Sequence, residues 1–240
     1  MFLGVIVNSA AVIIGSLIGV LLKKGISKRI SDAVMVGVGL CVIFIGVGGL
    51  IVENNVEAVS LAAIVSVVLG AVIGTLVDID KALNKLGDKI SARQKGAEAD
   101  SASLSEGFVN ASLLFCVGAM AIMGSLSSGL SGDHTTLYIK SILDFTSAIM
   151  LTATFGYSVM FSAVPLAIYQ GAITLCAGFL QPILSVGATD AITCTGSILI
   201  VGLALNLIGI TKIKIANYLP AIFISPFLYY LFDYILKFVR

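Results

Sequence analysis

The feature that most limits how this chain can fold is the length of its apolar runs. Stretches of about twenty residues recur along the sequence between short charged clusters, and a helix of about twenty residues is long enough to cross a bilayer. Only 11% of the residues are charged and 58% are apolar, whereas about a quarter of the residues of a soluble domain are charged. The sequence therefore predicts an all-α, polytopic membrane protein whose partner is the lipid bilayer.

About eight membrane-spanning helices are predicted from these runs. The fifth and sixth are divided only by a turn near Pro165, so a merged or re-entrant pair would reduce the count to seven. The first run has no basic leader and no clear small-residue cleavage site, so we expect a retained helix. The eight predicted spans cover residues 2–22, 33–52, 57–78, 107–130, 141–160, 164–184, 191–210 and 216–236.

Basic residues predict the orientation, because cytoplasmic loops of membrane proteins are enriched in Lys and Arg. With eight spans, three basic loops fall on one side of the membrane: residues 23–29, 81–95 and 212–214. The opposite side receives mainly acidic residues, apart from Lys237 and Arg240 near the C-terminus. We therefore expect the three basic loops to be cytoplasmic and both termini to be outside.

Residues 80–106 form the only sizeable polar segment. Leu83, Leu86 and Ile90 recur at helical spacing with lysines between them, which is typical of a short amphipathic helix on a membrane surface. The sequence GAEADSASLSEG follows, and its composition predicts a flexible linker.

Two segments far apart in the sequence begin alike. GVIVNSAAVI starts at Gly4 and GFVNASLLF starts at Gly107, so Asn8 and Asn110 open two apolar runs in the same way. Three spans in each copy would place the second copy upside down, as in many secondary transporters. Chance similarity between two apolar segments is the alternative. The predicted organisation is a first three-helix repeat at 1–80, a cytoplasmic amphipathic loop and linker at 81–106, an inverted three-helix repeat at 107–186 and a C-terminal helix pair at 187–240.

Polar side chains inside the predicted spans are the candidates for a solute or ion site, because polar groups at membrane depth are costly and are usually kept for a function. Asn8, Asn110 and Gln170 would supply hydrogen bonds at a central site between the two repeats. Asn206 lies deep in the seventh predicted span. Runs of glycine within the spans allow close helix packing and equally suit a homodimer.

Charged candidates cluster near the start of the fifth predicted span. Lys140 and Asp144 are four residues apart, a spacing that suits a local ion pair on a helix. The alternative is a site for a coupling ion or a proton. Asp133 and His134 precede them in an outer loop, where a solvated role is the simpler interpretation, although His can titrate near neutral pH.

Several other functions have no support in the sequence. It contains no HExxH, no phosphate-binding glycine loop with a lysine, no GxSxG and no paired carboxylates within a span, so we expect no enzyme activity. The four cysteines show no metal-binding spacing, and no cofactor or metal site is expected. The net charge is +1, which gives no long-range attraction to nucleic acid.

Three longer segments resemble a known family. EGFVNASLLFCVGAMAIMGSLSSGLSGDHTTLYIKSILD (106–144), YQGAITLCA (169–177) and KIKIANYLPA (212–221) are similar to domain-of-unknown-function family 554. That family comprises multipass proteins of the bacterial inner membrane. The resemblance covers nearly the whole chain and implies a bacterial plasma-membrane location. Carried onto this chain, the family's polar positions are Asn8, Asn110, Asp133, Lys140, Asp144, Gln170 and Asn217.

The sequence as a whole favours a secondary transporter of a small solute or ion that works by alternating access between two inverted repeats. Asp144, with Lys140, would gate or couple transport at the outer end. A passive channel lined by small and polar residues is one alternative. A membrane-embedded assembly protein without a substrate is another, because small-residue helix faces serve packing equally well.

Overall fold

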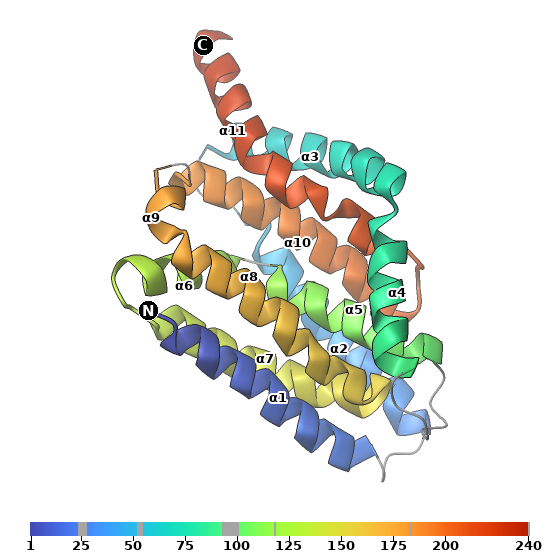
Figure 1. Ribbon diagram of the computed structural model, residues 1–240. Helices are drawn as coiled ribbons and strands as arrows, with labels where there is room; N and C mark the ends of the chain where they lie inside the picture. The colour runs from blue at the N-terminus through green and yellow to red at the C-terminus, as the bar shows by residue number, and fades with distance from the viewer. Residues whose placement is uncertain (24–27, 52–54, 93–100, 118, 183, 240) are drawn as a thin grey trace.

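The structure is a computed structural model that describes residues 1–23, 28–51, 55–92, 101–117, 119–182 and 184–239. The described residues are helical apart from short connections, and they contain no strand. The elements, coloured along the chain in Figure 1, are α1 (Leu3–Lys23), α2 (Lys28–Gly48), α3 (Val56–Val77), α4 (Ile79–Ala92), α5 (Ser101–Cys116), α6 (Ala119–Leu130), α7 (Thr135–Phe155), η1 (Tyr157–Ser162), α8 (Ala163–Leu175), α9 (Ala177–Leu180), α10 (Val186–Ile208), η2 (Ile215–Tyr218) and α11 (Pro220–Val239).

The all-helical membrane class is confirmed. Among the described residues, five helical segments are long and apolar enough to cross a membrane: Leu3–Leu22, Val56–Val77, Tyr157–Leu175, Val186–Ile208 and Ile215–Phe238. A sixth is obtained if α5 and α6, which are inclined by 56° to each other, form one bent span. The apolar part of α2 is shorter, and α7 contains a buried ion pair. The count of eight therefore stays a prediction, as do the inverted repeats.

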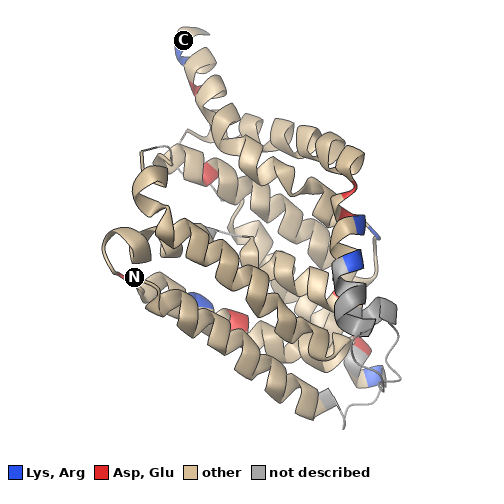
Figure 2. Ribbon diagram, in the orientation of Figure 1, with Lys and Arg blue, Asp and Glu red and all other residues tan. Residues whose placement is uncertain are grey.

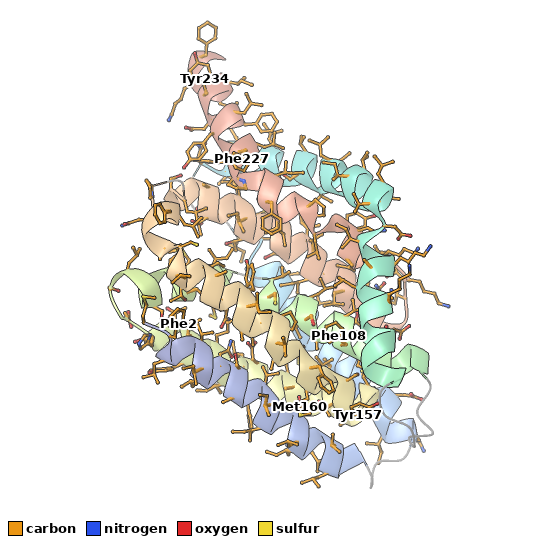
Figure 3. All side chains as sticks on the ribbon, in the orientation of Figure 1. Phe2, Phe108, Tyr157, Met160, Phe227 and Tyr234 are labelled. Atoms are coloured by element: carbon orange, nitrogen blue, oxygen red, sulfur yellow. The ribbon has the colours of Figure 1, made fainter. Side chains whose placement is uncertain are left out.

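The outer surface of the helices is apolar, as a lipid-facing surface must be. Phe44, Leu76 and Phe238 are each more than 80% exposed, and Phe227 and Tyr234 project from the outer face of α11 (Figure 3). Exposed apolar surface of this extent would be an aggregation liability in water. In a bilayer, the same side chains contact lipid.

Charged residues are few and unevenly placed. Lysines and arginines lie mainly at the end of the molecule where α4 is found (Figure 2). The interior is built from two clusters of apolar side chains. The smaller one joins α3, α10 and α11 through residues such as Val59, Ala191 and Tyr229, and the larger one fills the rest of the molecule.

The turn between the fifth and sixth predicted spans lies earlier than expected. α7 ends at Phe155, and Gly156 adopts φ 93°, which favours glycine. Pro165 lies in the first turn of α8, where its missing N–H has no intrahelical partner to lose. The fifth span predicted at 141–160 is therefore replaced by a helix at 135–155, and the sixth begins at 157.

A helix is present where the amphipathic helix was predicted, and its place on a membrane surface stays a prediction, whereas the linker is shorter than predicted. α4 covers Ile79–Ala92 and lies across the ends of its neighbours (Figure 1). α5 already begins at Ser101, so the second half of the expected linker is helical and the boundary at 106 falls inside a helix. Residues 93–100 lie outside the described residues.

Candidate functional site

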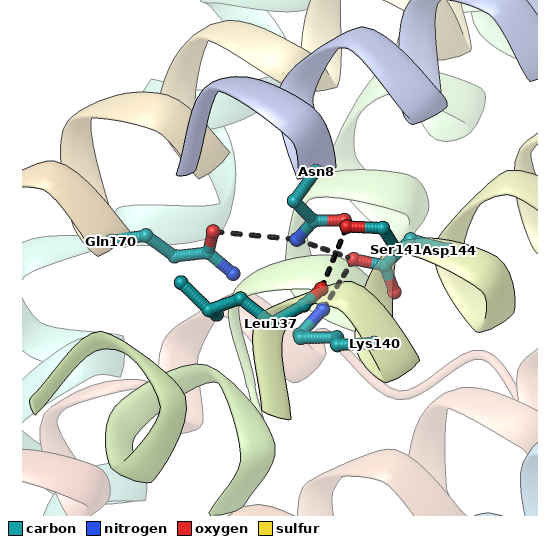
Figure 4. A network of polar contacts seen from close by, with 6 residues as sticks. All are labelled: Asn8, Leu137, Lys140, Ser141, Asp144 and Gln170. Atoms are coloured by element: carbon teal, nitrogen blue, oxygen red, sulfur yellow. Dashed lines mark hydrogen bonds and ion pairs between the residues drawn. The ribbon is translucent and has the colours of Figure 1, made fainter. Parts of the chain in front are cut away.

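Four of the sequence-predicted residues meet in one buried network. Asn8 of α1 donates from its side-chain nitrogen to Asp144 Oδ2 at 3.0 Å and to Gln170 Oε1 at 3.3 Å. Lys140 Nζ forms a short ion pair with the same Asp144 oxygen. Figure 4 shows α1, α7 and α8 converging on this polar centre. Residues separated by up to 162 positions along the chain thus form one site.

Small residues allow α1 to approach α7 closely enough for these contacts. A Cβ atom on Gly15 would lie 2.5 Å from the carbonyl oxygen of Phe145, and one on Gly19 would lie 2.5 Å from that of Ile149. The two backbones therefore touch, as at small-residue interfaces between membrane helices. Because Asn8 shares this face of α1, the same approach brings its amide to Asp144.

The electrostatics of the network depend on pairing. Asn8 and Gln170 are fully buried, and Lys140 and Asp144 are 5% and 7% exposed. Isolated charges at this depth would be very costly, so the ammonium and the carboxylate have to be close together. The ion pair predicted from the i,i+4 spacing is confirmed.

The network is not fully satisfied within the protein. Asn8 Oδ1 and Gln170 Nε2 are both buried and have no protein hydrogen-bond partner. One is an acceptor and the other is a donor. The network therefore offers one free acceptor and one free donor beside an ion pair, an arrangement that can bind water, an ion or a polar group of a solute.

Asn110 lies at a different place from Asn8. It is half-buried and lines an open cavity of about 500 Å³ between α4, α5 and the end of α10. The polar and charged lining consists mainly of Asp80, Glu106, Asn110, Asn206, Lys212 and Lys214. The polar centre around Asp144 and this cavity are therefore two separate candidate sites.

Asn206 has a structural role at the end of α10 rather than a place deep in a span. Its Nδ2 donates to the carbonyl oxygen of Ile213 at 2.7 Å, and its Oδ1 accepts from Thr211 Oγ1 and from the Ile213 amide. The helix ends two residues later, where Gly209 adopts φ 84°. The depth predicted for Asn206 was wrong, because the Gly209 turn ends the helix at Ile208.

The side chains of Asn217 and Asp133 also accept hydrogen bonds from backbone amides. Buried Asn217 accepts a hydrogen bond of 2.7 Å from the amide of Asp80, which ties η2 to the first turn of α4. Asp133 is exposed and accepts from the Thr135 amide at 2.9 Å. This backbone hydrogen bond holds the pKa of Asp133 below its usual value. Both residues therefore have a local structural explanation.

Several polar residues of the sites were missed by sequence reasoning. Asp80 and Glu106 lie outside the predicted spans, and only the tertiary structure brings them to one cavity. Thr152 and Thr174 are buried in α7 and α8. The available signal was their spacing: Thr174 follows Gln170 by one helical turn, and Thr152 follows Asp144 by about two.

Metal binding has no structural support in the part of the chain that the structure describes, which contains no group of three or more His, Cys, Asp or Glu side chains able to hold a metal ion. His134 instead pairs with Ser128 at 2.8 Å. The four cysteines are free thiols.

Comparisons with known proteins agree with the sequence resemblance. The family model described as "Protein of unknown function (DUF554)" matches residues 3–230. The chain is 32% identical over 223 residues to "Uncharacterized membrane protein YdfK" of Bacillus subtilis (strain 168), covering 93% of each protein. It is 28% identical over 230 residues to "Uncharacterized protein YqgA" of Escherichia coli (strain K12), covering 94% of this chain and 95% of that protein. No solved structure matches the chain.

Proposed function

The chain belongs to the family described as "Protein of unknown function (DUF554)", and from this premise we propose that it is a secondary transporter of a small solute or ion working by alternating access. It is a membrane protein, as its apolar helices indicate, and the Bacillus subtilis relative is likewise named a membrane protein. We further propose that it resides in the bacterial plasma membrane, with the α4 end on the cytoplasmic side.

One observation carries the proposal: a charged network is buried where three helices meet. Lys140, Asp144 and Asn8 could be replaced by apolar residues if the helices only had to pack, since well-packed apolar substitutes for a buried ion pair are often neutral or stabilising. Ionisable residues inside membrane helices typically mark ion or substrate paths. The free acceptor of Asn8 and the free donor of Gln170 add binding capacity at the same point.

The network can act as a switch between two conformations. Asp144 accepts a hydrogen bond from Asn8 of α1 and forms an ion pair with Lys140 on its own helix, α7. An ion that binds or neutralises Asp144 would weaken the charged acceptor that joins α1 to α7. The two helices could then change their relative position, and this is the differential interaction that a two-state transporter requires.

The cavity at the α4 end supplies a place for solute to enter. Its volume of about 500 Å³ suits a small molecule. Two carboxylates, two lysines and several amides face it, so a polar solute can be solvated there. In this proposal the cavity is the open side of the transporter, and the Asp144 network is the coupling site.

A thermal-shift screen followed by uptake tests this proposal. The detergent-purified protein is screened against small metabolites and ions, because a ligand that binds the folded state raises its melting temperature. We expect a saturable shift that Asn110→Ala weakens. The hit is then offered to proteoliposomes under ion gradients, where we expect saturable, uphill uptake.

The coupling role of Asp144 is tested with a folding control. Asp144→Asn alone leaves Lys140 unpaired, so it is compared with the double variant Lys140→Met with Asp144→Asn. Both should lose gradient-driven uptake, and the double variant should keep its thermal stability. Uptake that never saturates and cannot run uphill would favour a channel instead. The absence of any ligand for a stable, homogeneous protein would favour an assembly role.

A further inference from the structure

Buried polar atoms without a protein hydrogen-bond partner are concentrated on one group of helices. In the described part of the chain, all of them except Ser66 on α3 lie on α1, α6, α7, η1 and α8. Of these, α1, α6 and η1 pack against α7, which carries Asp144, and α8 packs against α1 and α6. Buried polar groups are nearly always hydrogen-bonded, to protein or to ordered water. Their concentration here indicates that polar contacts continue through this group of helices.

Several of these atoms belong to successive helix turns between Asp144 and the end of the molecule where α7 begins, and we call this series of residues the row. Asn8 and Gln170 contact the Asp144 centre, and Thr174 lies one turn further along α8. A Cβ atom on Gly129 of α6 would touch the backbone of Thr174, which places the end of α6 beside it. Ser125 of α6, also buried and without a partner, lies one turn before Gly129.

The row reaches the surface at His134. Ser128 Oγ, in the last turn of α6, donates to the carbonyl oxygen of Met1 at 2.7 Å and lies 2.8 Å from His134 Nδ1. His134 is partly exposed in the loop before α7. Helix turns that carry amide and hydroxyl groups therefore lie between this loop and Asp144.

The row is interrupted on the other side of Asp144. Apart from Ser9, which adjoins Asn8, the next buried polar groups without partners on these two helices are Ser16 on α1 and Thr152 on α7. Each lies eight residues beyond Asn8 or Asp144 and therefore about 12 Å further along its helix. The interval contains Val12 and Ala148, both fully buried in the same apolar cluster. These two closely packed apolar side chains therefore provide no polar group between Asp144 and the polar side chains beyond them.

We propose that Asp144 exchanges a proton with the end of the molecule where α7 begins, through the row of buried amides and hydroxyls, and that Val12 and Ala148 close the route in the other direction. This inference rests on the proposed function and names its coupling ion. A proton that arrives along the row binds a carboxylate oxygen of Asp144 and leaves the Lys140 ammonium without its counter-charge. The cost of that buried charge favours the change to the other conformation. In the other conformation the proton leaves on the opposite side.

A proton fits this site better than a metal cation does. Lys140 Nζ already occupies Asp144 Oδ2, so a sodium ion would have to bind beside a fixed positive charge. A proton needs only one oxygen and removes the charge of the carboxylate. The groups that face Asp144 are Asn8 on α1, Gln170 on α8, Lys140 on α7 and the thiol of Cys116 on α5, which lies near the Lys140–Asp144 pair and near Tyr169 of α8.

The apolar interruption provides the test. Val12→Thr keeps the shape of the side chain and adds a hydroxyl, so it should let protons pass without solute. The matched control is Val7→Thr, the same change at a 37% exposed position of the same helix. Proteoliposomes containing a pH-sensitive dye are exposed to a membrane potential. We expect Val12→Thr to leak protons about tenfold faster than Val7→Thr, which corresponds to a barrier lower by about 1.4 kcal/mol.

Two further variants keep the test decisive. Ala148→Ser adds a hydroxyl from the opposite helix, and we expect it to leak protons as well. It replaces Val12→Thr in the test if that variant does not fold. Adding Lys140→Met with Asp144→Asn should return either leak to the control rate. We call Val12→Thr and Ala148→Ser the gap variants. The inference would be overturned if the folded gap variants leaked protons no faster than Val7→Thr, or if the leak persisted without Asp144.

The outcomes of these experiments separate failure of the proton route from failure of the proposed transporter function. Solute uptake that depends on Asp144, with no leak in the gap variants, would retain the transporter and reject the proton route. A leak through Asp144 without any solute coupling would retain the route and reject the transporter.

Discussion

At the residue scale, the buried Lys140–Asp144 pair on α7 is the feature on which the proposed function most depends. Lys140 and Asp144 neutralise each other, and the hydrogen bond from Asn8 links α1 to that pair. Removing one charge leaves the other buried and unpaired, which typically costs about 3–5 kcal/mol, whereas replacing both is often nearly neutral. We therefore expect Asp144→Asn to lower the melting temperature clearly and Lys140→Met with Asp144→Asn to restore it. Thermal unfolding of the three proteins in detergent measures this, and equal stability of the single and double variants would contradict it.

The amide of Asn8 gives a second prediction at this scale. Asn8→Leu removes the donor that links α1 to Asp144 and Gln170 but leaves the ion pair on α7. Hydrogen bonds to charged groups contribute about 1.5–3 kcal/mol, so we expect a loss of stability within that range and loss of coupled uptake. Val7→Leu, at the preceding and exposed position of α1, is the control. Unchanged uptake in a folded Asn8→Leu protein would remove the amide from the mechanism.

At the scale of elements, the contact of α1 with α7 depends on glycine. A Cβ atom on Gly15 would lie 2.5 Å from a backbone carbonyl of α7, whereas one on Gly37 of α2 would meet nothing within 4 Å. Overpacking usually costs about 1–3 kcal/mol, so Gly15→Ala should lower the melting temperature. Gly37→Ala should be neutral or stabilising, because alanine is the better helix former. Thermal unfolding of both variants checks this, and equal effects would contradict the close packing.

The positions of elements also show what sequence reasoning can and cannot reach. Apolar run length located the helices, and the i,i+4 spacing identified the Lys140–Asp144 pair, because both are local properties. The turn at Gly156 was misplaced to Pro165, since proline fits the first turn of a helix as well as a loop. The meeting of Asn8 with Gln170, and the separation of Asn110 from both, depend on how α1, α7 and α8 pack. Nothing local encodes that arrangement.

At the scale of the whole molecule, the distribution of charge sets the orientation in the membrane. Lysines and arginines lie mainly at the α4 end (Figure 2), and such residues are retained on the cytoplasmic side. The open cavity with Lys212 and Lys214 lies at the same end, whereas the His134 loop adjoins the start of α7. We therefore expect the cavity to face the cytoplasm and the proton route to face outward.

Cysteine labelling in intact cells tests this orientation. In a background without the four native cysteines, Ser131→Cys beside His134 should react with a membrane-impermeant maleimide added outside, and Lys214→Cys should react only after permeabilisation. Both positions are exposed, so a difference in labelling reflects the side of the membrane rather than burial. Labelling of both from one side would contradict the orientation. Labelling of Lys214→Cys alone from outside would invert it, and the proton would then enter from the cytoplasm while solute met the cavity from outside.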